Sequence, residues 1–121
     1  MGADGSDKLR VLFCLGVMPA FFEAGPDGRQ EAFEAIPAAF EDLEGRFGIN
    51  VLATFDDDRL AVGAPPAGAW TAYIVADAPS LDAAIALCGV LRETDLPSGA
   101  KLWKYLRIEA RVGRRLFFGN A

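Results

Sequence analysis

The order of apolar patterns along the chain limits the possible folds more than any other feature. Residues 10–17, 49–55, 70–76 and 101–112 are runs rich in branched and aromatic side chains, which is typical of β-strands. In the first and last of the three intervals between these runs, apolar side chains recur at helical spacing. The chain therefore predicts an α+β domain in the order strand, helix, strand, strand, helix, strand.

This order is the ferredoxin-like β-α-β-β-α-β pattern. Because crossovers between strands of one sheet are right-handed, both helices should cover one face of an antiparallel sheet with strand order 4-1-3-2. We expect the first helix to begin near Pro26, with Asp27 accepting from free amides and Gln30 reaching back, and to be kinked by Pro37. Ser80 should cap the second helix. Two stripes are predicted to face the sheet: Phe33, Ile36, Phe40, Leu43 and Phe47 on the first helix, and Leu81, Ile85, Cys88 and Leu91 on the second.

Length and composition are those of one globular domain. The 121 residues are 52% hydrophobic and 24% charged, and we expect a disordered lead-in over residues 1–7 and a single domain over residues 8–121. The net charge of −5 argues against nucleic acid as a partner, and no apolar run approaches the roughly 20 residues of a membrane span. Cys14 and Cys88 lie in apolar runs, which indicates reduced thiols in a cytoplasmic protein.

The chain contains no histidine, which excludes Ser-His-Asp and Cys-His nucleophiles and histidine-ligated haem or zinc. The three consecutive carboxylates of residues 56–58 do not indicate a metal site. They cannot all face one ion from an extended strand, and they lack the spacing of a calcium-binding loop. They predict a turn. We therefore expect no metal and no cofactor, and keep Asp56 as a candidate ligand-binding residue because its strand parity directs it to the open face.

Side chains alternate between the two faces of a strand, so parity sorts the residues of the predicted sheet. In the last run Leu106, Ile108, Ala110 and Val112 share one parity and should face the helices. The open face is predicted to carry Leu12, Cys14, Leu52, Thr54, Asp56, Thr71, Tyr73, Val75, Trp103, Tyr105, Arg107, Glu109 and Arg111. A face with this much apolar area would be adhesive in a monomer, so we expect a two-fold homodimer packed through it.

The element order, the chain length and this half-polar face resemble the dimeric α/β-barrel superfamily of ferredoxin-like proteins over residues 8–112. The segments V-L-F-C (11–14), A-T-F-D-D-D (53–58) and R-I-E-A-R-V-G-R (107–114) also resemble small accessory proteins linked to indole-3-acetate catabolism. The superfamily includes cofactor-free monooxygenases, haem-degrading enzymes, muconolactone-type isomerases and pure ligand binders. The resemblance implies a dimeric barrel, and the missing histidine makes the typical haem degraders poor models.

Arg107 and Glu109 form the strongest candidate constellation, because they stand two residues apart on one predicted face. They form either a salt bridge at a dimer interface or a ligand site. In a ligand site, Arg107 would bind a carboxylate or enolate while Glu109 orients it or acts as a base. Tyr73, Tyr105 and Trp103 would then supply aromatic walls.

Two further features are open to two interpretations each. Cys14 is either a small inert side chain or a nucleophile whose pKa a nearby Arg107 lowers. Phe21 and Phe22 either close the mouth of a cavity or attach their loop to Phe33.

Three functions remain possible for a chain with these features. The first is a small-molecule-binding or accessory protein of aromatic-acid catabolism, with indole-3-acetate as one candidate ligand. The second is a cofactor-independent monooxygenase or isomerase acting on an aromatic substrate. The third is a structural dimerisation module. The sequence identifies no catalytic residue, so fold alone does not choose among the three.

Overall fold

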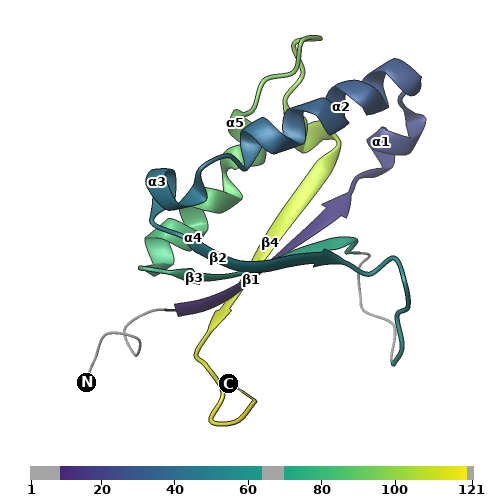
Figure 1. Cartoon of the computed structure of the whole chain (residues 1–121). Coiled ribbons are helices and arrows are strands. Elements are labelled where there is room, and N and C mark those ends of the chain that lie inside the picture. The colour runs from purple at the N-terminus through teal and green to yellow at the C-terminus, as the bar shows by residue number, and fades with distance from the viewer. Residues whose placement is uncertain (1–8, 64–69, 120–121) are drawn as a thin grey trace.

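The computed structural model describes residues 9–63 and 70–119, in which helices cover one face of a four-stranded sheet (Figure 1). All strand pairs are antiparallel and the strand order is β2-β3-β1-β4, as predicted. The predicted lead-in, residues 1–7, lies outside the described residues. The elements are β1 (Leu9–Val17), α1 (Pro19–Glu23), α2 (Pro26–Ala39), α3 (Leu43–Phe47), β2 (Asn50–Asp56), β3 (Ala72–Ala78), α4 (Leu81–Cys88), α5 (Val90–Glu93), the 3-10 helix η2 (Leu102–Lys104) and β4 (Leu106–Gly113).

The hydrophobic core lies between the sheet and the helices. Alternate residues of β1 enter it, and Val11 and Phe13 are almost completely buried. The other large side chains that are fully buried come from the helix layer and the segments joining it to the sheet: Ile49, Leu87, Leu91 and Leu102. Within the described residues, no helix is long and apolar enough to span a membrane.

The first predicted helix is divided into two. Helix α2 begins after Gly25, without the predicted side-chain cap from Asp27, and ends two residues beyond Pro37. Pro37 has no backbone N–H to donate to the helix, which weakens the last turn of α2 and favours the end of the helix there. Helix α3 follows after Asp42, whose backbone is left-handed (φ 47°) and whose carboxylate accepts from the amide of Gly45. The predicted stripe is interrupted accordingly, and Phe33 is 65% exposed.

The second predicted helix is also shorter than its pattern. The Ser80 hydroxyl accepts from the amide of Ala83, which confirms the predicted cap. Helix α4 then stops at Gly89, and the short helix α5 follows it. The predicted register was wrong for Leu81 and Ile85, which are exposed, because α4 turns Ala84 and Leu87 toward the core instead.

The prediction for the second strand was wrong at Thr54 and Asp56. A β-bulge between Val51 and Ala53 shifts the register, so Thr54 pairs with Ile74 on the helix side of the sheet. Asp56 shares that side, and its carboxylate accepts a hydrogen bond from the amide of Asp58. Residues 59–63, which follow this segment, form no strand.

The last predicted strand was too long at its beginning. Strand β4 begins at Leu106, and residues 102–104 form η2. Because strand alternation does not extend into a 3-10 turn, the predicted open-face positions of Trp103 and Tyr105 were wrong. Tyr105 belongs to the core, with only 6% of its surface exposed, and Trp103 lies at the surface of η2.

Candidate functional site

The sheet face that no helix covers in Figure 1, called here the bare face, carries most of the predicted site residues. Residues paired directly across antiparallel strands point to the same face, so the registers identify its members. These are Asn50, Ala53 and Phe55 of β2, Tyr73, Val75 and Asp77 of β3, Arg10, Leu12, Cys14 and Gly16 of β1, and Arg107, Glu109 and Arg111 of β4.

Cys14 lies at the centre of the bare face, directly opposite Tyr73 on one side and Glu109 on the other. Its larger neighbours leave it only 2% exposed. Burial raises the pKa of the Cys14 thiol, Arg111 opposes this effect and Glu109 adds to it. The net increase keeps the thiol protonated near neutral pH, so the nucleophile interpretation, which needs a lowered pKa, is not supported.

Tyr73 forms the aromatic part of this face. Its ring stacks on Phe55 with 4.9 Å between the ring centroids, and its hydroxyl donates a hydrogen bond to the Asp57 carboxylate at 3.1 Å. Burial raises the pKa of Tyr73, and the bond to Asp57 raises it further. The phenol is therefore a fixed, protonated group that holds the loop after β2 against the sheet.

Three charged residues of β4 lie on the bare face: Arg107, Glu109 and Arg111. Glu109 binds Arg111 within the chain, with 2.6 Å between a guanidinium nitrogen and a carboxylate oxygen. A salt bridge between Arg107 and Glu109 across a dimer interface stays a prediction. Arg107 lies over the ring of Trp70, with its guanidinium carbon 4.3 Å from the ring centroid. Both β4 arginines are thus held in place on the bare face.

A hollow of about 310 Å³ lies at the end of the bare face near Arg10. Its lining residues include the apolar Leu12 and Val75 and three arginines, Arg10, Arg111 and Arg114. Asp77 fixes Arg10 at 2.7 Å, in the same way that Glu109 fixes Arg111. We call this feature the arginine hollow. It combines apolar walls with three cations, a combination suited to an aromatic acid.

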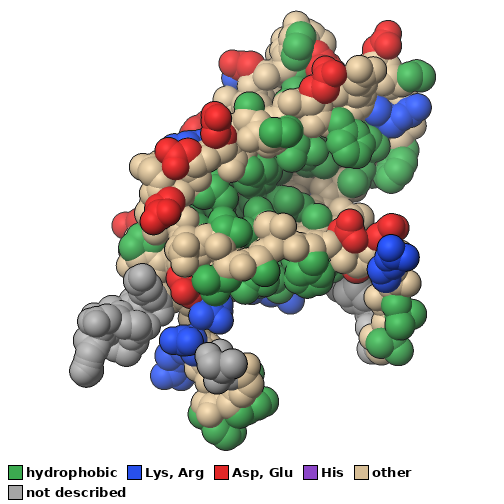
Figure 2. All heavy atoms as spheres, in the orientation of Figure 1, with side chains coloured by type: hydrophobic (Ala, Val, Ile, Leu, Met, Phe, Trp, Pro, Cys, Tyr) green, Lys and Arg blue, Asp and Glu red, His purple; other side chains and the backbone are tan. Residues whose placement is uncertain are grey.

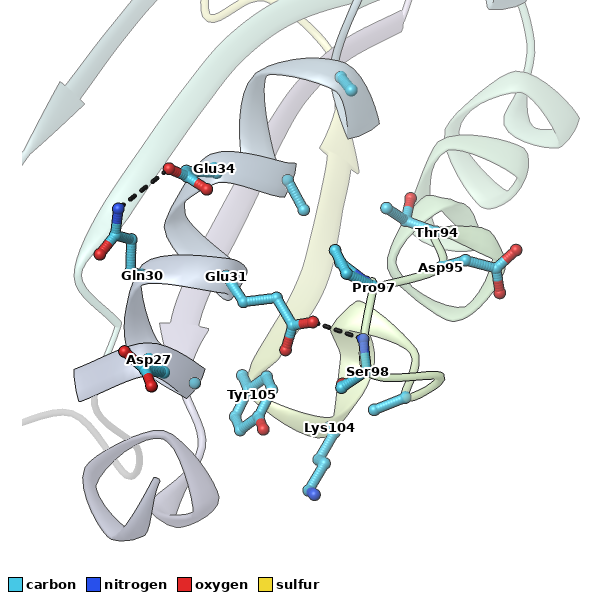
Figure 3. A pocket seen from close by; sticks show the side chains of 14 residues that line it. Asp27, Gln30, Glu31, Glu34, Thr94, Asp95, Pro97, Ser98, Lys104 and Tyr105 are labelled. Carbon is cyan, nitrogen blue, oxygen red and sulfur yellow. Dashed lines mark hydrogen bonds between the residues drawn. The ribbon is translucent and has the colours of Figure 1, made fainter. Parts of the chain in front are cut away.

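The remaining predicted site residues are dispersed. Trp103 lines a separate hollow of about 340 Å³ beside the edge of β4, where it lies near Arg107. Tyr105 lines a larger groove between α2 and the segment 94–105, on the opposite side of the sheet (Figure 3). Asp56 is at the end of β2 on the helix side. The structure therefore brings together Cys14, Tyr73, Glu109 and Arg107, and separates the other three.

Several residues of the bare face were absent from the predicted site. Arg111 shares the parity of Glu109, so the sequence was sufficient to place it on this face. Its ion pair with Glu109 was not predicted. Phe55 was assigned to the other face because the bulge in β2 leaves no periodic signal. Arg114 lies beyond the strand, where parity no longer applies.

Among residues 9–63 and 70–119, no three cysteine or carboxylate side chains lie close enough together to hold a metal ion. The buried polar side-chain atoms in these ranges all have hydrogen-bond partners. The chemistry of the bare face is therefore that of arginine, carboxylate, phenol and thiol groups.

No protein-family model matches the chain. No curated protein matches it in sequence. Among solved structures, it is similar to a protein of unknown function from Rhodopseudomonas palustris, with a TM-score of 0.57 and 19% identity. The similarity covers 92% of this chain and 84% of the other. At this level of identity the likeness shows a shared α+β fold alone.

Proposed function

We propose that this protein is a cytoplasmic small-molecule-binding protein of aromatic-acid catabolism. In this proposal two chains pack through their bare faces as a ferredoxin-like dimeric α/β barrel, and a bound aromatic acid occupies the arginine hollow. The observation that carries the proposal is that three arginine residues and several apolar residues line one hollow of about 310 Å³. That volume is at the lower end of the range of small-molecule sites.

The dimer is supported by the apolar area that the bare face leaves uncovered. Phe55 is 54% exposed, although its ring is stacked on Tyr73, and Leu12 and Val75 are only half-buried. A second copy placed by a two-fold axis would cover this area with one self-complementary surface. It would also close the arginine hollow, which a single chain leaves open to solvent.

The preference for an acid is supported by how the arginines are held. A guanidinium presents two parallel N–H donors that match the two oxygens of a carboxylate. Arg10 and Arg111 each use part of this capacity on Asp77 and Glu109, which orients them without filling every donor position. Arg114 adds a third cation at the rim.

Binding is preferred to catalysis because the bare face holds no activated group. The raised pKa of Cys14 keeps its thiol protonated, and the Tyr73 hydroxyl already donates to Asp57. The alternative of a cofactor-independent monooxygenase or isomerase would need a substrate that supplies its own reactive electrons. The third alternative, a structural dimerisation module, would use the same dimer without a ligand.

Calorimetric titration of the full chain with indole-3-acetate and phenylacetate tests the proposal. We expect saturable binding that Arg111→Ala weakens about tenfold or more, because charge-assisted hydrogen bonds to a carboxylate are lost. Arg92→Ala, which removes an exposed arginine from α5 in the helix layer, is the matched control and should bind like the wild type. If neither acid binds saturably, the proposal is overturned. If Arg111→Ala and Arg92→Ala weaken the binding of the acid equally, the arginine hollow is not the binding site.

NMR spectra of the ligand after prolonged incubation distinguish binding from turnover. The proposal predicts that the acid is recovered unchanged. Conversion of the acid without added metal or flavin, lost in Arg111→Ala, would favour the enzymatic alternative.

A further inference from the structure

A second large cavity lies away from the bare face, in the helix layer. It is a groove of about 820 Å³ between α2 and residues 94–105, called here the α2 groove. Figure 3 shows Glu31 reaching from α2 toward Ser98, with Tyr105 and Lys104 at the same end of the groove. The proposed function makes no use of this groove.

Tyr105 is the feature of the α2 groove that points to a ligand. Its ring belongs to the hydrophobic core and only 6% of its surface is exposed. The backbone is fixed on both sides, since its amide donates to Leu102 and its carbonyl accepts from Met18. A Cβ atom placed on Gly28 would lie 3.6 Å from the Tyr105 hydroxyl oxygen, so the hydroxyl reaches the first turn of α2.

The Tyr105 hydroxyl makes no hydrogen bond to residues 9–63 and 70–119, and its oxygen is not one of the fully buried polar atoms, which all have partners. Nearly all of the ring is covered, so the small accessible part of this side chain faces the groove that it lines. Tyrosine hydroxyls in protein interiors usually find a partner. A ligand in the groove would supply one.

Glu31 places a carboxylate at the same end of the groove as Tyr105 (Figure 3). Its Oε1 atom accepts a hydrogen bond of 2.6 Å from the amide of Ser98, which holds the side chain across the groove. The Oε2 atom is left on the side of Tyr105 (Figure 3). Two acceptors, one of them charged, therefore face the same end of the groove.

The charge of the groove favours a cation. Among its lining residues are four carboxylates, from Asp27, Glu31, Glu34 and Asp95, and one ammonium group, from Lys104. Acidic side chains also gather on the helix layer in Figure 2, where a few basic ones lie among them. The rest of the groove is formed largely by small apolar residues, which would suit the hydrocarbon part of a ligand: Gly28, Ala35, Ala38, Pro97 and Ala100.

We propose that the α2 groove binds a small primary amine whose ammonium group donates hydrogen bonds to Glu31 Oε2 and to the Tyr105 hydroxyl. A primary ammonium carries three donors, so it can satisfy both acceptors at once. A carboxylic acid would instead meet an excess of like charge. The two sites of the protein would thus select ligands of opposite charge on opposite sides of the sheet.

The test uses the full chain and two ligands with the same ring and opposite charge, 2-phenylethylamine and phenylacetate. Binding is followed by calorimetry and by the ¹⁵N–¹H resonance of Ser98, whose amide contacts Glu31. We expect the amine to bind saturably and to shift the Ser98 resonance. Phenylacetate should leave that resonance in place.

Three variants locate the ammonium group. Glu31→Gln should weaken amine binding about tenfold or more, and Tyr105→Phe several-fold, because each removes one acceptor. Glu44→Gln removes the same charge from the exposed surface of α3 and should bind like the wild type. No saturable binding of the amine, or equal weakening in Glu31→Gln and Glu44→Gln, would overturn the proposal. Amide spectra establish that each variant is folded, and neither result depends on whether the arginine hollow binds acids.

Discussion

The Glu109 carboxylate binds the Arg111 guanidinium at 2.6 Å along one edge strand of the bare face. This pair occupies part of the hydrogen-bonding capacity of an arginine that also lines the arginine hollow. The ion pair within the protein and a carboxylate ligand therefore compete for one guanidinium group. The pKa of Arg111 is raised, mainly by its hydrogen bond to Glu109, so the group remains charged in either state.

Replacing Glu109 by Gln should strengthen the binding of an aromatic acid, because the neutral amide competes less well for Arg111. The stability of the fold should change little, since exposed ion pairs contribute little to it. Calorimetry with phenylacetate and urea unfolding measure the two effects. Weaker binding in Glu109→Gln would show that the carboxylate orients Arg111 for the ligand and does not compete with it.

Tyr73 should titrate above the ordinary tyrosine pKa of 10.0, because burial and the bond to Asp57 both favour the protonated phenol. In Asp57→Asn the pKa should decrease and remain above the ordinary value, since burial persists. Absorbance at the phenolate band, corrected with Tyr73→Phe for the other tyrosine, gives both values. A wild-type Tyr73 that titrates at or below its ordinary value would contradict the hydrogen bond and the burial described for it.

Cys14 should react slowly with iodoacetamide at neutral pH. Burial raises its pKa above the ordinary 9.0, so the folded chain holds the proton more tightly than the unfolded chain. Its contribution to stability is therefore complete below the unfolded pKa and is lost as the pH rises through the folded pKa. Alkylation of Cys88→Ser, in which Cys14 is the remaining thiol, should be much faster in urea than in native buffer. Equal rates at pH 7 would contradict the buried, protonated thiol.

Helix α4 provides a matched pair of substitutions. Leu87 is fully buried, so Leu87→Ala should lower the free energy of unfolding by about 2–5 kcal/mol. Ile85 lies two residues earlier and is 69% exposed, so Ile85→Ala should change it by no more than about 0.5 kcal/mol. Urea unfolding measures both values. A larger decrease in the free energy of unfolding for Ile85→Ala than for Leu87→Ala would contradict the observed register of α4 and favour the register predicted from the sequence.

The element order and the strand order were predictable because they depend on periodicity and on the handedness of crossovers. The positions of Cys14 and Tyr73 on the bare face followed from parity for the same reason. Parity was unreliable where a strand is interrupted. The bulge between Val51 and Ala53 moves Phe55 to the bare face, and the turn at η2 places Tyr105 in the core.

The partner of Glu109 was not predictable from spacing. Arg107 and Arg111 stand equally far from it along the strand, and the choice between them depends on a third residue. Trp70, distant in sequence, lies under the guanidinium of Arg107. Strand parity could not predict the arginine hollow either, because the hollow combines residues of three strands with Arg114 in the segment that follows β4.

The central claim is that two bare faces pack together and close the arginine hollow. Sedimentation equilibrium of the full chain tests it most directly, alongside Leu12→Glu, which places a charge on the half-buried bare-face position opposite Val75. We predict the mass of two chains for the wild type and the mass of one folded chain for the variant. A wild type that sediments as a single chain at every concentration would contradict the claim.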